Sequence, residues 1–329
     1  MLNTYRSRRS GGHALLMTFL ALPAAFLLLG ACSIQDYAIE MVSDALTGDG
    51  SASVFLEEND PQLVGDALPF AIKLYETLLA ENPGHPGLTL TTGSLYVMYA
   101  NAFLQTPALY LPLERYDERI EYLERAKNLY LRGKDFMLEY LDGRYPGFAA
   151  ALEGSTDPAG SADGEIPELE EMLYKLDSED VAYAYWLGAG WFGAVSIDSF
   201  DLALAFRIPS VLALLERASQ IEPEFDNGAI HELLIQVYAS IPEGMGGSRE
   251  KAVNSFSRAV EIQQGRSASP YLSLATSVAL PAQDLDWFIE LMNAALAIDP
   301  DDFPELRLMN TLSRQQARWY LDHIGDFFI

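Results

Sequence analysis

The chain has 329 residues, of which 50% are hydrophobic and 21% charged, a composition typical of a folded globular protein and unlike that of disordered or collagen-like chains. It carries 21 basic and 47 acidic residues, a net charge of -26. Nucleic-acid binding and adhesion to an anionic membrane surface both need a basic patch, so this balance argues strongly against either function.

The first 31 residues predict an export signal. Arg6, Arg8 and Arg9 precede a nearly continuous apolar run, and small residues then lead into Leu29-Gly30-Ala31-Cys32. Small residues before the cut suit a signal peptidase, and a cysteine directly after them resembles a bacterial lipobox. We therefore expect residues 1–31 to be removed and Cys32, the only cysteine, to be the lipidated residue that holds the protein at the membrane. The alternative is an uncleaved membrane-spanning anchor over residues 14–31.

Beyond this signal, apolar residues recur at helical spacing, and no stretch shows the sustained alternation of a strand. Asn82-Pro83-Gly84 is typical of a helix stop, and we expect the next helix to end before Pro107. The sequence predicts an all-α fold, with helices over residues 63–80, 88–104, 116–141, 168–176, 178–197, 209–221, 229–239, 249–264, 270–279, 285–298 and 303–324.

The second half of the chain repeats itself. In each copy a small residue is followed by a Pro or Gln at which the helix should end, and then by a new helix. An earlier copy is visible near residue 75. The residues that carry this pattern are Ala71, Tyr75, Pro83, Gly93, Tyr96, Ala218, Pro223, Ala252, Phe256, Ala259, Gln264, Ala295 and Pro300. This is a degenerate tetratricopeptide (TPR)-like pattern, with intervals that depart from the usual period of about 34 residues. We predict a compact, α-solenoid-like array of helix pairs.

Three parts are expected in the chain: the signal peptide at 1–31, a lipidated tether with a short helix at 32–60, and one all-α TPR-like domain at 61–329. The stretch 154–164 is small, polar and rich in Gly and Pro. It reads as a flexible surface loop inside the array, with a domain linker as the alternative.

The segment 181–197 contains no charged residue and several aromatic residues. Gly188, Gly190 and Gly193 in this segment have the GxGxxG spacing found in dinucleotide-binding sites. A dinucleotide site would need a preceding strand, so we interpret these glycines as contacts between closely packed helices. A buried central helix is favoured over a membrane insertion. Some of the aromatic residues are also candidates for lining a ligand cavity, namely Tyr96, Tyr183, Trp186 and Trp191.

No catalytic or metal site stands out. His231-Glu232 begins like a zinc-protease motif, but Ile235 occupies the place of the second histidine. Acidic runs such as Asp177, Glu179 and Asp180 are typical of solvated faces or of helix N-termini, although a paired-carboxylate hydrolase stays open as an alternative. We expect no enzyme activity, no cofactor and no metal.

Several blocks together resemble the T component of TRAP-type transport systems, a family of lipoproteins with cryptic TPR-like repeats. They are 182–186 and 190–192, 215–231, 246–259 and 310–328. The resemblance implies an all-α homotrimer whose subunits each carry a pore or cavity. It also implies association with the periplasmic ligand-binding (P) component of the transporter.

Two functions therefore remain in view. The first is a membrane-anchored, periplasm-facing transport accessory that docks the P component and handles a hydrophobic or amphipathic ligand, in a bacterium with two membranes. The second is a non-enzymatic TPR-like scaffold lipoprotein for envelope protein assembly. The strong negative charge would repel an anionic ligand, so either the P component supplies the positive groups for such a ligand, or the ligand is neutral or apolar.

Overall fold

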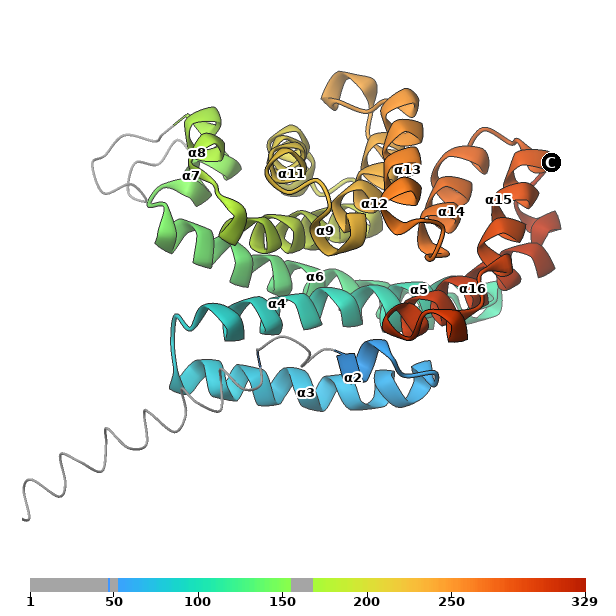
Figure 1. Cartoon of the computed structure of the whole chain (residues 1–329), viewed down its shortest axis with the longest axis horizontal. Helices are drawn as coiled ribbons and strands as arrows, with labels where there is room; N and C mark the ends of the chain where they lie inside the picture. The colour runs from blue at the N-terminus through green and yellow to red at the C-terminus, as the bar shows by residue number, and fades with distance from the viewer. Residues whose placement is uncertain (1–46, 48–52, 155–167) are drawn as a thin grey trace, which may run out of the picture.

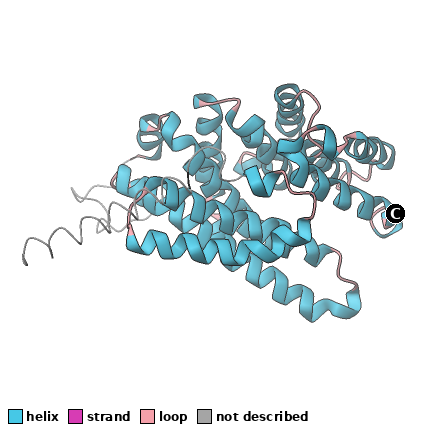
Figure 2. Ribbon diagram, turned by 60° about the horizontal axis from the view of Figure 1, so that its bottom comes forward, coloured by secondary structure: helices cyan, strands magenta, loops and turns pink. Residues whose placement is uncertain are grey.

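The computed structural model describes residues 47, 53–154 and 168–329. The expected signal peptide, Cys32 and the stretch 155–164 lie outside these residues. Within them every regular element is a helix, as the all-α prediction required, and no strand occurs (Figure 2). No helix in this part is both long and apolar enough to cross a membrane.

Long helices form the first part of the molecule. Asp60 caps the first long helix by accepting hydrogen bonds from two backbone N–H groups, and residues one helical turn apart then face the core. Gly93 has no side chain and so lets helices α4 and α6 approach closely. A Cβ atom on Gly93 would lie only 2.9 Å from the backbone oxygen of Gly133. The elements are α2 (Ser53–Leu56), α3 (Pro61–Glu81), α4 (Pro86–Ala100), α5 (Thr106–Leu109), α6 (Tyr116–Arg144), α7 (Phe148–Glu153) and α8 (Leu169–Lys175).

The expected helix end before Pro107 is wrong. A π-helical turn over Asn101–Gln105 joins α4 directly to α5, and Pro107 lies in the first turn of α5. Pro107 directly follows the residue at which this wide turn closes, since the N–H of Thr106 donates to the carbonyl of Asn101 five residues back, and proline itself has no N–H to donate. A second π turn, Ala275–Ala279, extends helix α14 (Ser269–Leu274). These wide turns leave no clear signal in the apolar periodicity.

Helix α9 (Val181–Ile197) is central to the fold (Figure 1). A Cβ atom on Gly190 would lie 2.9 Å from the backbone oxygen of Tyr130 in α6, and one on Gly188 would lie 2.6 Å from Leu215 in α11. The glycines therefore permit close helix contacts, which confirms the interpretation made from the sequence.

The second half is built of helix pairs. Ala218, Ala259 and Ala295 are each fully buried in the first helix of a pair, where a small residue lets the helices touch. This arrangement is consistent with the TPR-like prediction. The elements are α10 (Leu202–Ala205), α11 (Ile208–Ile221), α12 (Phe225–Ser240), α13 (Arg249–Gln263), α14 (Ser269–Leu274), α15 (Leu285–Ala297) and α16 (Arg307–Asp322).

The last helix returns to the first ones, so the array closes on itself (Figure 1). Arg307 donates a hydrogen bond to the backbone oxygen of Glu57 at 3.0 Å, and the rings of Trp319 and Tyr110 lie 5.1 Å apart. An open solenoid has free ends, whereas here contacts between residues about 250 positions apart fix both ends.

Candidate ligand-binding site

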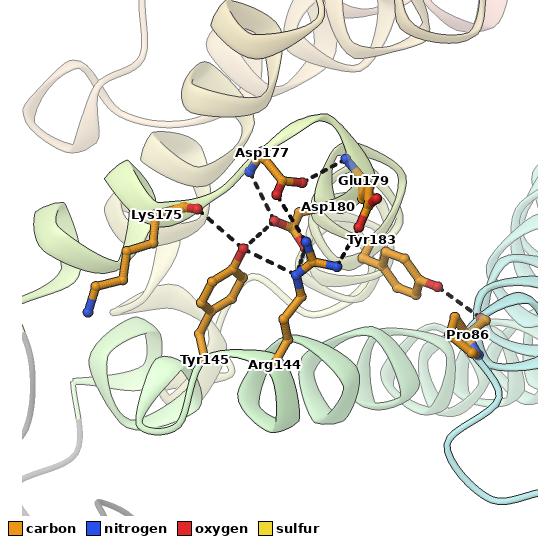
Figure 3. A network of polar contacts seen from close by, with 8 residues as sticks. All are labelled: Pro86, Arg144, Tyr145, Lys175, Asp177, Glu179, Asp180 and Tyr183. Atoms are coloured by element: carbon orange, nitrogen blue, oxygen red, sulfur yellow. Dashed lines mark hydrogen bonds and ion pairs between the residues drawn. The ribbon is translucent and has the colours of Figure 1, made fainter.

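The start of α9 is held by an ion-pair network around Arg144 (Figure 3). Its guanidinium lies 3.0 Å from Asp177, 2.8 Å from Glu179 and 3.2 Å from Asp180, and Tyr145 donates to Asp180 at 2.7 Å. Asp177 and Asp180 also form a capping box at the short 3-10 turn before α9. These acids are helix N-terminal groups, one of the two interpretations offered by the sequence, and they fix α9 against the end of α6.

Tyr183, one of the predicted cavity residues, is 4% exposed. Its hydroxyl donates to the backbone oxygen of Pro86 at 2.9 Å (Figure 3), and its ring stacks on that of Tyr140 with 3.7 Å between centroids. Burial is the largest of the effects that raise the pKa of Tyr183. The side chain therefore joins α9 to α4 and α6.

The side chains of Trp191 and Tyr96 also contact other residues of the protein. The indole nitrogen of Trp191 donates to the backbone oxygen of Leu204 at 3.1 Å, and the ammonium of Lys134 lies 4.9 Å from its ring centre. The hydroxyl of Tyr96 accepts from Lys73 at 3.1 Å, and its ring stacks on Phe136. A ligand role for these two buried residues stays a prediction.

Trp186 has different surroundings. It is half-buried, and its ring meets that of Tyr185 edge-on at 4.9 Å; the ring of Tyr185 lies 5.5 Å from that of Phe225. All three rings keep part of their surface accessible. Three of the four predicted residues are thus on α9 and one is on α4, and of the four only Trp186 is itself incompletely buried.

The backbone beside Phe225 is strained. Asp226, Asn227 and Gly228 all have positive φ angles, of 41°, 53° and 86°. Left-handed geometry costs a non-glycine residue about 1–2 kcal/mol, and such strain gathers at functional sites. Regular helix begins only after this turn, close to the predicted start at residue 229.

The carboxyl group of Glu232 lies one helical turn after this left-handed segment. Burial raises the pKa of Glu232 to about 7, and Asp226 adds to the rise, whereas hydrogen bonds from Gln263 and Ser269 oppose it. Burial also raises the pKa of Tyr185, on which the charge of Glu232 acts, and desolvation raises the pKa of Asp226 although its side chain is exposed. Glu232 nevertheless keeps partial solvent contact. A carboxyl this desolvated and still accessible is a functional-site candidate.

Gln263 completes this group from the last turn of α13. It is 5% exposed, and its side-chain oxygen Oε1 has no hydrogen-bond partner among the described residues. An unpaired buried acceptor costs about 1–3 kcal/mol, so it marks a place where a donor is missing. We call Tyr185, Phe225, Asp226, Glu232, Gln263 and Ser269 the Glu232 cluster.

His231 lies in a separate groove between α11 and α13. The groove has a volume of about 430 Å³, and burial lowers the pKa of His231. Glu216 in this groove is engaged by Tyr238 at 2.6 Å and by Lys251 at 3.0 Å. Across the described part of the chain, no three His, Cys, Asp or Glu side chains are grouped as metal ligands would be.

A second groove, of about 380 Å³, lies between α15 and α16. Leu296, Pro300 and Thr311 contribute to it, together with Arg314 and Arg318. Most arginines of this acidic chain contact a carboxylate, a carbonyl or an aromatic ring. Arg314 and Arg318 show no such contact among the residues the structure describes, so this groove presents uncompensated positive charge.

The sequence reasoning missed Glu232 and Gln263 as a site. In the sequence, Glu232 belongs only to an incomplete zinc-protease motif, and no pattern singles out Gln263. One usable signal is that Glu232 is the only acidic residue within the stretch 229–239. The other was Asn227-Gly228, a pair typical of left-handed backbone.

Comparisons with known proteins agree with this architecture. The family model of the TRAP transporter T-component matches residues 57–328. The chain is 35% identical to an uncharacterised protein of Treponema pallidum over 93% of its own length and 96% of that protein. A local match, 40% identical over 65 residues, involves the mitochondrial cytochrome c oxidase assembly protein cox16 of Aspergillus oryzae; it covers 19% of this chain and 48% of that protein. Because the family model spans nearly the whole described part, the chain belongs to the TRAP transporter T-component family, which comprises accessory components of TRAP transport.

Proposed function

We propose that this protein is a lipid-anchored, periplasm-facing homotrimer that docks the ligand-binding P component of a TRAP system and handles a hydrophobic or amphipathic ligand. The observation that carries the proposal is the family match across residues 57–328. The anchor follows from the lipobox at Cys32, and the trimer follows from the family resemblance.

The half-buried aromatic rings of Tyr185, Trp186 and Phe225 support the ligand-handling part. Aromatic surface that keeps solvent contact beside a desolvated polar group is typical of small-molecule sites. An apolar molecule would cover these rings and gain from leaving water.

The groove between α15 and α16 supports the docking part. Arg314 and Arg318 lie one helical turn apart and present positive charge beside the apolar surface of Leu296 and Pro300. The groove is too open to enclose a small molecule, so it suits carboxylate side chains on a partner protein.

The first experiment is native mass spectrometry of the mature chain, residues 32–329, carrying Cys32→Ser so that no lipid is attached. Alone it should be a trimer that retains an apolar molecule, and with the P component it should form a mixed complex. Absence of any complex with the P component would favour the scaffold function.

A charge-reversal experiment tests the docking surface. The double variant Arg314→Glu/Arg318→Glu should weaken P-component binding at least tenfold. Arg119→Glu is the matched control, because Arg119 also has no charged partner in the described part and lies on α6. Equal losses in both variants would contradict docking at this groove.

The anchor has its own test. Cys32→Ala should abolish acylation and release the protein from membranes, measured by fractionation. Membrane retention at normal abundance would contradict the lipobox assignment.

A further inference from the structure

We propose that Glu232 and Gln263 form the polar end of a ligand site in each subunit, which takes an amphipathic molecule whose head group donates hydrogen bonds, an amine or a primary amide and not a carboxylate. This inference names the ligand class for the ligand-handling part of the proposed function, on which it rests.

The first step of the argument concerns acceptors without donors. Gln263 is buried, and its side-chain Oε1 has no hydrogen-bond partner among the described residues. Gln263 and Ser269 act on Glu232 only to the extent of lowering its pKa against the effect of burial, and a carboxylate has room for several donors. The cluster therefore presents surplus acceptors, and a ligand with N–H groups would satisfy them.

The second step concerns charge. The groups that set the ionisation of Glu232 are Gln263, Asp226 and Ser269, none of which is a cation. His231, the next residue along α12, has a lowered pKa and stays neutral near pH 7. An anionic head group at Glu232 would thus meet the carboxyl groups of Glu232 and Asp226, whereas a neutral or cationic donor would be attracted; the charge of Arg258 acts on His231 and not on Glu232.

The third step concerns the apolar part of the ligand. Tyr185 and Phe225 place half-buried rings on one side of Glu232, where the charge of Glu232 reaches Tyr185. Phe256 lies two helical turns before Gln263 on α13, and its half-buried ring meets that of Tyr271 at 5.4 Å. Aromatic surface therefore lies on both helices that supply the acceptors.

The fourth step concerns rigidity. Asp226, Asn227 and Gly228 hold the chain in a left-handed turn that connects Phe225 to the helix carrying Glu232. This turn fixes the aromatic and the acidic groups relative to each other. A prearranged site loses less ordering free energy when a ligand binds.

The test uses three probes with the same alkyl chain: octylamine, octanamide and octanoate. Each is titrated by isothermal calorimetry into the mature chain, residues 32–329 with Cys32→Ser, at physiological ionic strength. Octylamine and octanamide should bind, and octanoate should bind at least tenfold more weakly. Equal affinity for octanoate, or no binding of any probe at millimolar concentration, would overturn the proposal.

Variants separate the site from general attraction to an acidic protein. Glu232→Gln should weaken octylamine binding about tenfold, whereas Glu290→Gln, at an exposed acid on α15, should leave it unchanged. Equal losses in the two variants would assign the binding to surface charge and overturn the inference. Gln263→Met keeps the side-chain size without the acceptor and should weaken both octylamine and octanamide. It supplies the decisive measurement if Glu232→Gln does not fold.

The same variants are then assayed for P-component binding, which keeps the two proposals apart. Loss of probe binding preference with intact P-component binding would overturn only the ligand class. Intact probe binding without P-component binding would overturn only the docking function.

Discussion

Helix α9 presents aromatic residues both to α6 and to α12, but the two interfaces differ in how completely these residues are buried. Toward α6, Gly190 lets the backbones approach and Gly193 leaves room for the ring of Tyr130, and Trp191 is 2% exposed with its N–H paired. Toward α12, Tyr185 meets Phe225 with both rings half-buried, beside the desolvated Glu232.

The difference shows that aromatic content does not distinguish core from site. Against α6, the rings of Trp191 and Tyr183 are buried, and the indole N–H and the hydroxyl of these two residues each donate a hydrogen bond. Against α12, an acceptor on Gln263 is unpaired, and the backbone at Asp226 is strained. Unmet hydrogen bonds and strain, rather than the rings themselves, mark the second interface as the candidate site.

The largest expected effect is at the covered interface. Trp191→Ala removes a fully packed ring and its hydrogen bond to Leu204, and it should lower the free energy of unfolding by about 3–5 kcal/mol. Guanidinium denaturation followed by far-UV circular dichroism measures this. A loss below about 1 kcal/mol would show that Trp191 is not a core residue.

The Glu232 cluster should respond to pH instead. The pKa of Glu232 is about 7 in the folded protein and lies near 4.5 when unfolded, so the folded state binds more protons between these values. Stability should therefore fall as pH rises from about 4.5 to 7, by on the order of 2 kcal/mol, since partial solvent contact reduces the full effect. Glu232→Gln should flatten this dependence in denaturation curves at pH 5 and pH 8. An unchanged slope would contradict the buried carboxyl.

The glycine contact with α6 predicts a smaller loss. Gly190→Ala would place a Cβ atom 2.9 Å from the backbone oxygen of Tyr130 and 3.0 Å from Cβ of Lys134, neither of which can move freely. Overpacking costs about 1–3 kcal/mol, and the better helix propensity of alanine returns up to about 1. Thermal unfolding should show a net loss, whereas Gly143→Ala, which meets no neighbouring atom, should be neutral or stabilising.

Trp186→Ala should separate the two interfaces most directly. Because its ring is half-buried, the variant should lose only about 1–2 kcal/mol of stability, less than half the loss for Trp191→Ala. Probe binding should weaken if Trp186 contributes aromatic surface to the ligand. A stability loss equal to that of Trp191→Ala, with binding unchanged, would assign Trp186 to the core.

The smallest effect concerns the left-handed turn. Asn227 has a φ of 53°, and glycine adopts this geometry without strain, so Asn227→Gly should change stability by less than about 1 kcal/mol in either direction. If the turn is held for ligand binding, probe affinity should fall with little change in melting temperature. A large destabilisation would show that the Asn227 side chain, and not its backbone, is what the fold requires.

The sequence by itself determined the helical class, most helix positions and the role of the α9 glycines. Apolar spacing and Pro or Gly stops act locally, so they can be read without knowing what each helix touches. Helix α9 is predicted at 178–197, and the structure gives a 3-10 turn followed by Val181–Ile197. The π turn before Pro107 was missed because its cause is how the chain packs, not a residue pattern.

Only the tertiary structure decided which aromatic residues are covered and where a site lies. Tyr183 and Trp186 are close in sequence, yet contacts from α4 and α6 bury one and leave the other accessible. Glu232 becomes unusual only because packing desolvates it, and Gln263 only because its oxygen has no partner among the residues that the structure describes. Desolvation and hydrogen-bond pairing depend on residues that are far apart along the chain. The local residue pattern does not predict the closed array of helices that brings these residues together.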